Sequence, residues 1–132
     1  MSELQPYSLD HVSRRIIQKF KPQDAVTLTA SGGGTPSNTS ATIKVQGASN
    51  IFLEAKHDYA ESLSTNLDVL VYPSADGLDF STSPIGALNL SGTGVLPLSI
   101  TPGMHSVRVK VQNNDAVNGS KILTRLIVTH AS

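Results

Sequence analysis

The strongest constraint on the fold of this chain is the alternation of apolar and polar residues in short segments after residue 40. In residues 106–111, Val107, Val109 and Val111 alternate with serine, arginine and lysine. Successive side chains of a β-strand point to opposite faces of a sheet, so a period of two predicts a strand with one buried face.

Similar patterns predict about eight strands in all. The expected segments are residues 23–30, 42–46, 51–56, 67–72, 88–90, 96–100, 106–111 and 122–128. Turns rich in Gly, Pro, Asn, Asp and Ser separate them, and no helix-length pattern lies between two strands. This organisation predicts an all-β antiparallel β-sandwich, either jelly-roll or immunoglobulin-like, and argues against a parallel α/β sheet.

Two segments carry more specific expectations. Pro97 interrupts residues 96–100, and proline has no N–H to donate to a ladder, so this strand is expected at a sheet edge. Residues 122–128 are apolar on both faces except at Arg125. A strand of this kind is either central in its sheet or covered by another part of the structure.

The first 24 residues have a different pattern. Leu9, Val12, Ile16 and Phe20 follow one another at spacings of three, four and four, and Pro22 follows. The spacing predicts a short amphipathic helix over residues 8–20, although the β-branched pair Ile16-Ile17 leaves a strand over residues 12–20 as the alternative. We therefore expect an N-terminal arm over residues 1–24 and a sandwich domain over residues 25–132, with a flexible glycine-rich loop at residues 31–40.

The composition excludes several classes of function. The chain has no cysteine, which removes disulfide scaffolds, thiolate zinc sites, iron–sulfur clusters and cysteine nucleophiles. Its ten basic and ten acidic residues balance, which argues against a nucleic-acid partner. No run of about 18 apolar residues predicts a membrane span. The first residues lack the basic flank and apolar run of a secretory signal, so we expect synthesis in the cytoplasm without secretion by a signal peptide.

Candidate catalytic and metal-binding residues do not form a recognisable motif. The four histidines (His11, His57, His105 and His130) are far apart in sequence, and no Gly-x-Ser-x-Gly elbow is present. The pair Asp76 and Asp79 flanks Gly77 and is better explained by a tight turn than by a calcium loop, which needs six or more oxygen ligands. We expect a protein that is not an enzyme and has no cofactor and no metal site.

Basic residues cluster in the predicted arm, at Arg14, Arg15, Lys19 and Lys21. The cluster is either the solvated face of a helix or a surface that docks on another protein. We expect the arm to contact a partner through Arg14, Arg15, Ile16 and Phe20.

The second half of the chain resembles small β-sandwich proteins of tailed-phage virions. The resemblance covers roughly residues 65–130. It rests on the strand at residues 68–72, the turn Ser74-x-Asp76-Gly77-x-x-Phe80 and the strand at residues 106–115. It implies a capsid decoration (cement) protein or another virion accessory protein, which contacts the major capsid protein or another virion protein, often as a trimer or dimer.

Two other functions fit the same residues. A tail or baseplate component is the nearest variant of a virion protein. A glycan- or surface-binding module is the alternative from another class, with Tyr59 and Tyr72 as the tyrosines in the strand region on which a sugar ring could stack.

Overall fold

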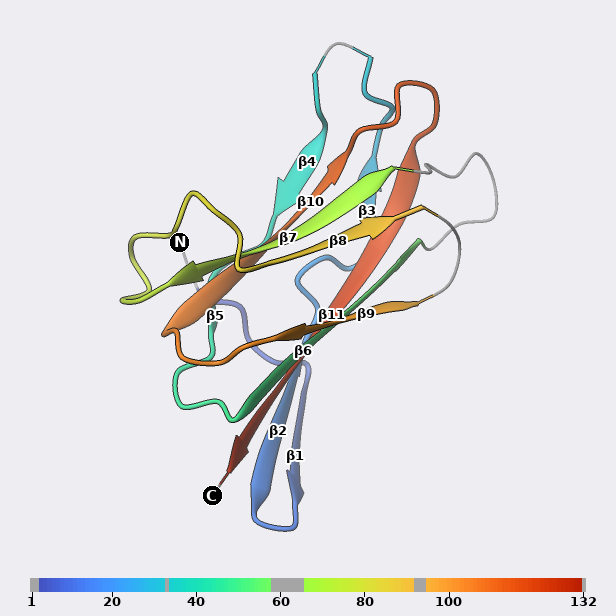
Figure 1. The fold of residues 1–132 in the computed structure, drawn as a ribbon. Coiled ribbons are helices and arrows are strands. Elements are labelled where there is room, and N and C mark those ends of the chain that lie inside the picture. The colour runs from blue at the N-terminus through green and yellow to red at the C-terminus, as the bar shows by residue number, and fades with distance from the viewer. Residues whose placement is uncertain (1–2, 33, 58–65, 92–94, 132) are drawn as a thin grey trace.

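The computed structural model describes residues 3–32, 34–57, 66–91 and 95–131, and within these ranges it contains eleven β-strands and no helix. The strands form two antiparallel sheets (Figure 1). The first sheet has the order β1-β2-β11-β6-β9, with β3 also paired to β11, and the second has the order β4-β10-β7-β8, with β5 also paired to β10.

The strand bounds in the first sheet are β1 Ser8–Val12, β2 Arg15–Phe20, β3 Val26–Leu28, β6 Asn50–His57, β9 Leu96–Ile100 and β11 Ser120–Ala131. Those in the second are β4 Ser37–Thr39, β5 Ile43–Lys44, β7 Leu67–Ser74, β8 Gly86–Leu90 and β10 Ser106–Asn113.

The chain crosses repeatedly between the two sheets. From β5 it passes to β6 in the first sheet, to β7 and β8 in the second, to β9 in the first, to β10 in the second and finally to β11 in the first. This order matches a jelly roll, in which two four-stranded sheets close over one core. The hairpin of β1 and β2 extends the first sheet beyond that pattern.

The expectations about individual strands are confirmed. The strand that contains Pro97 is β9, and among the described strands it pairs with β6 alone, at the edge of the first sheet. The last strand, β11, is central, because it lies between β2 and β6. Its outer face stays partly accessible, with Arg125 exposed and Leu123 and Ile127 half-buried.

The predicted helix over residues 8–20 is wrong. These residues form the hairpin of β1 and β2, joined by a turn at Ser13 and Arg14. The helical spacing does not correspond to a buried face, because Leu9 and Val12 are half-exposed and only Phe20 is buried. Pairing of β2 with the long strand β11, in which Phe20 lies opposite Leu126, satisfies the backbone of Ile16 and Ile17 in the conformation that β-branched residues favour.

The segment expected as a flexible loop also contains a strand. Within residues 31–40, Ser37–Thr39 form β4 and pair with β10. These residues carry no large apolar side chain, so their alignment follows from backbone pairing with β10 and not from burial.

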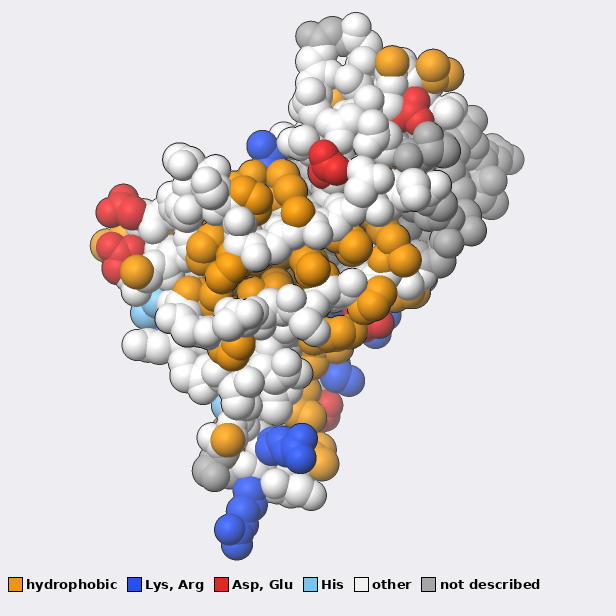
Figure 2. Space-filling model, in the orientation of Figure 1, with side chains coloured by type: hydrophobic (Ala, Val, Ile, Leu, Met, Phe, Trp, Pro, Cys, Tyr) orange, Lys and Arg blue, Asp and Glu red, His pale blue; other side chains and the backbone are white. Residues whose placement is uncertain are grey.

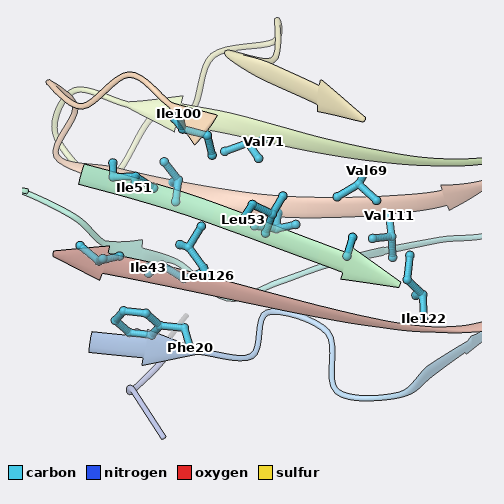
Figure 3. Packing of buried hydrophobic residues seen from close by; sticks show 14 of the residues in the cluster. Phe20, Ile43, Ile51, Leu53, Val69, Val71, Ile100, Val111, Ile122 and Leu126 are labelled. Carbon is cyan, nitrogen blue, oxygen red and sulfur yellow. The ribbon is translucent and has the colours of Figure 1, made fainter. Parts of the chain in front are cut away.

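One hydrophobic core fills the space between the sheets (Figure 3). The second sheet contributes alternate valines from β7 and β10, and the first contributes Ile51 and Leu53 from β6 with Ile122 and Leu126 from β11. Phe20 closes one end of this cluster from β2. These inward positions are the ones that the period of two selects.

Candidate functional site: the N-terminal hairpin

The hairpin of β1 and β2 lies at one end of the molecule, beside the end of β11 (Figure 1). Its two strands are joined by Ser13 and Arg14, whose φ angles are 46° and 65°. A two-residue turn with positive φ at both positions matches the twist of the flanking strands and favours Asn-Gly. Serine and arginine adopt it at a cost of about 1 kcal/mol or more each, so the turn stores local strain.

The structure separates the four predicted contact residues. Arg14 and Arg15 are exposed at the tip of the hairpin, and Figure 2 shows basic side chains at this end of the molecule. Ile16 is half-buried on β2, and Phe20 is only 2% exposed within the core. The two arginines therefore lie at the surface, whereas Phe20 stabilises the fold.

The other two basic residues of the cluster have partners within the hairpin region. Lys19 lies 3.8 Å from the carboxylate of Asp10 on β1. Lys21 lies over the ring of Tyr7, 4.8 Å from its centroid. The charges of Lys19 and Lys21 are therefore partly compensated by Asp10 and by the ring of Tyr7.

An open pocket of about 280 Å³ lies beneath the hairpin. Ile16, Gln18 and Phe20 of β2 line one side, and Lys44 lies on the other. His130 of β11 contributes a ring nitrogen, Nε2, which lies 3.0 Å from the amide oxygen of Gln18. The first described residues cross this opening, because Leu4 donates its N–H to the carbonyl of Thr42 at 2.7 Å and Tyr7 donates to Lys19 at 2.8 Å.

The Asp76 carboxylate accepts hydrogen bonds within its own tight turn, as the sequence predicts. Its oxygen Oδ1 accepts N–H groups from Leu78 at 2.9 Å and Asp79 at 3.0 Å and lies 3.1 Å from the Ser74 hydroxyl. These hydrogen bonds, that of Asp79 first, hold the pKa of the Asp76 carboxyl below its ordinary value. Gly77 has a φ of 81°, which confirms the need for glycine in the turn.

The end of this turn packs against the second sheet. The Arg108 guanidinium of β10 lies 4.0 Å from the centroid of the Phe80 ring. This cation–π contact gives the Asp-Gly-x-x-Phe sequence a structural role, because it anchors the turn on the sheet.

Sequence reasoning missed a cluster of amides around Asp68 on the second sheet. The Asp68 carboxylate accepts N–H groups from the side chains of Asn89 at 2.8 Å, Asn114 at 2.8 Å and Gln112 at 3.3 Å. Asn89 and Gln112 lie directly opposite Asp68 on the two neighbouring strands. The pairing of three strands assembles this cluster, so no local motif reveals it.

The described histidines do not converge on a metal site. Within residues 3–32, 34–57, 66–91 and 95–131, no group of three or more His, Cys, Asp or Glu could hold a metal ion. His105 instead places Nδ1 2.7 Å from the Ser106 hydroxyl.

Of the two tyrosines on which a sugar ring could stack, Tyr59 lies outside the described residues. Tyr72 is half-buried on β7, opposite Arg108. No helix in the described part of the chain is long and apolar enough to cross a membrane.

No protein-family model and no curated protein matches the sequence. Solved structures match its fold. The PBSX exported protein XepA superposes with a TM-score of 0.63 at 13% identity, over 98% of this chain and 44% of XepA. VP2 of the infectious bursal disease virus subviral particle gives a TM-score of 0.56 at 14% identity, over 92% of this chain and 34% of VP2. The K3 cleaved adhesin domain of Lys-gingipain from Porphyromonas gingivalis gives 0.50 at 12% identity, over 87% and 72% of the two chains.

These similarities define the class of fold. The chain spans less than half the length of XepA and of VP2. At identities this low the likeness shows a shared β-sandwich architecture, which is compatible with many functions.

Proposed function

We propose that this chain is a non-enzymatic structural protein of a phage virion, which decorates or stabilises the capsid by contact with the major capsid protein or another virion protein. The observation that carries the proposal is the likeness of almost the whole chain to folds that include VP2 of a viral subviral particle. The jelly-roll order supports it, because such sandwiches recur in viral capsid proteins.

The local chemistry supports a role in contact over catalysis. Several carboxylate and imidazole side chains, which are residue types common in catalytic sites, make hydrogen bonds within the protein. Asp76 accepts three hydrogen bonds within its own turn, Asp68 accepts three amide N–H groups, and His105 lies against Ser106. Groups used in this way stabilise loops and strand pairing.

The contact that we propose runs through the hairpin tip. Arg14 and Arg15 are exposed and project from the end of the first sheet, so they can reach an acidic surface on a virion protein. Ile16 borders the pocket beneath the tip and can add an apolar contact. Phe20 is not part of this surface, because it is buried in the core.

Association with particles tests the proposal. Particles of a phage that encodes this chain are purified on a density gradient, and the chain is located by mass spectrometry and by immunogold labelling. Labelling over the shell is the expected result, and labelling at the tail or baseplate would replace capsid decoration by the nearest variant. A chain that stays in the soluble fraction and is absent from banded particles overturns the virion role.

A charge reversal tests the hairpin contact separately. The variant Arg14→Glu/Arg15→Glu is added to particles that lack the chain, and binding is measured by co-sedimentation. The matched control is Arg125→Glu, which reverses an exposed arginine of β11 away from the tip. We expect the tip variant to lose binding and the control to retain it. Equal binding by both variants contradicts the assignment of the tip.

A glycan- or surface-binding module is the second candidate, favoured by the likeness of the fold to the K3 cleaved adhesin domain. Tyr72 offers an aromatic ring on the outer face of the second sheet, but it is only partly accessible. A glycan array distinguishes the two functions. Saturable binding to one class of sugar, lost in Tyr72→Ala, supports the module, and no binding on the array leaves the virion role as the proposal.

A further inference from the structure

We propose that β1 is the edge through which two copies of this chain pair, so that the first sheets of both copies form one continuous antiparallel sheet. This inference does not depend on the virion role. It uses the strand edge of the hairpin and leaves the arginine tip accessible to another partner.

The strand β1 is an open edge with accessible side chains. It pairs only with β2, so one side of its backbone has no strand partner among the described residues. Leu9 is 53% exposed and Val12 is 51% exposed. An exposed edge strand without proline readily accepts another strand.

The other edges are less available. In the first sheet, β9 carries Pro97, which has no N–H for a further ladder. In the second sheet, Leu4 donates an N–H to Thr42 beside β5 and so occupies part of that edge. The edge strand β8 lies close to β9, where a Cβ on Gly86 would come within 3.2 Å of the Leu98 side chain.

The sequence of β1 favours a second copy of itself in one register. Two antiparallel copies related by a two-fold axis must place one residue opposite its own copy. With Leu9 at the centre, two half-exposed leucines face each other, and Ser8 lies opposite Asp10 of the second copy, where its hydroxyl can donate to the carboxylate. Tyr7 lies before β1 and donates its N–H to Lys19, so the pairing in this register is centred on Ser8, Leu9 and Asp10.

The neighbouring registers are less favourable. A pair centred on Asp10 places two carboxylates opposite each other, and one centred on His11 places two imidazoles opposite each other and Asp10 against Val12. A pair centred on Val12 requires Ser13 and Arg14 to be extended, but both have positive φ in the turn. The register centred on Leu9 therefore gives the most favourable residue pairs between two copies of β1.

The expected association is weak and reversible. Pairing along one five-residue strand buries less surface than a standard protein–protein interface. We expect a monomer–dimer equilibrium, detected by sedimentation velocity as a concentration-dependent shift toward the dimer.

Cysteine cross-linking tests the register directly, because the chain has no native cysteine. In the Leu9 register the two Leu9 Cα atoms lie at the separation of directly opposed antiparallel residues, about 4.5–5.5 Å, which a disulfide can bridge. Leu9→Cys is expected to form a disulfide-linked dimer about tenfold faster than Val12→Cys under mild oxidation, because only the former is held opposite itself. Val12→Cys is the matched control, since Val12 is exposed to the same extent but lies three residues from the centre.

The outcomes are decisive in both directions. Faster cross-linking of Leu9→Cys, together with loss of the wild-type dimer in Leu9→Lys, supports the pairing. Equal cross-linking of the two cysteine variants, or a wild-type chain that stays monomeric at its highest soluble concentration, overturns it. Neither result changes whether the chain is found in banded particles, so the failure of one proposal is distinguishable from the failure of the other.

Discussion

Gln23 and Thr124 are joined by three hydrogen bonds at the boundary between the two sheets. The Thr124 hydroxyl donates to Oε1 of Gln23 at 2.6 Å and accepts the Gln23 backbone N–H at 2.9 Å, while the Thr124 N–H donates to the Gln23 carbonyl at 2.9 Å. Gln23 also donates through Nε2 to the carbonyl of Val109 on β10, at 2.8 Å. A fully buried polar side chain thus connects β11 of the first sheet to β10 of the second.

Replacing either partner leaves buried groups without hydrogen bonds. We expect Gln23→Leu and Thr124→Val each to lower the free energy of unfolding by about 1–3 kcal/mol, because an unsatisfied buried polar group carries its desolvation penalty. Chemical denaturation of the single variants and the double variant measures the coupling. A double variant that loses much less than the sum of the two single losses confirms the pairwise interaction, and strict additivity contradicts it.

Truncation of Phe20 is expected to lower the free energy of unfolding strongly, whereas truncation of the tip arginines is expected to change it little. Phe20→Ala removes a core side chain and should lower the free energy of unfolding by about 3–5 kcal/mol. The double variant Arg14→Ala/Arg15→Ala changes exposed residues and should leave it within about 0.5 kcal/mol. Thermal unfolding of both measures the contrast. A stable Phe20→Ala variant would place Phe20 at the surface and restore it as a contact residue.

The alternating strands could be predicted from sequence, whereas the hairpin could be predicted only in part, because the alternative strand over residues 12–20 covers β2 but not β1. In β10 the alternating residues Val107, Val109 and Val111 are all buried, as the pattern predicts. In the hairpin, the spacing from Leu9 to Phe20 matches a helix by coincidence, and the conformation is decided by pairing with β11, more than 100 residues further along the chain. Local sequence does not encode such a distant partner.

The proposed contact surface was predictable from sequence only in part. The basic residues Arg14 and Arg15 indicate a charged end, and the structure exposes both. The open edge of β1 was not visible, because the sequence gives no strand there and an edge is a property of sheet order. The strand β4 was also missed, since its three polar residues form a strand only because β10 lies beside them.

Two glycines with nearly the same backbone angle differ in the space around them. Gly77 has a φ of 81°, and a Cβ there would lie 2.8 Å from Nδ1 of His105, whereas Gly47 has a φ of 82° and its nearest atom is 3.9 Å away. We expect Gly47→Ala to lower the free energy of unfolding by about 1 kcal/mol for the strained φ alone. Gly77→Ala should lose more because the added methyl group also displaces His105. Equal losses in denaturation experiments contradict this difference.

The Asp76 turn predicts a loss of stability in acid. Because its pKa is lowered in the folded state, the stabilisation is complete above the ordinary carboxyl pKa and is lost as the pH falls through the folded pKa. We expect Asp76→Asn to reduce the fall in melting temperature below about pH 4, since the amide oxygen still accepts hydrogen bonds but does not titrate. Identical acid profiles for the wild-type chain and Asp76→Asn contradict the assignment.

The turn of the hairpin should be more stable with a different sequence. Ser13 and Arg14 both have positive φ, which Asn-Gly adopts with less strain. We expect Ser13→Asn/Arg14→Gly to raise the free energy of unfolding by about 0.5–1 kcal/mol, measured by chemical denaturation. The same variant removes one of the two tip arginines, so its binding to particles should weaken although the fold is more stable. If stability and binding instead rise together, the strained arginine is not retained for contact, and Arg15 alone accounts for the charge at the tip.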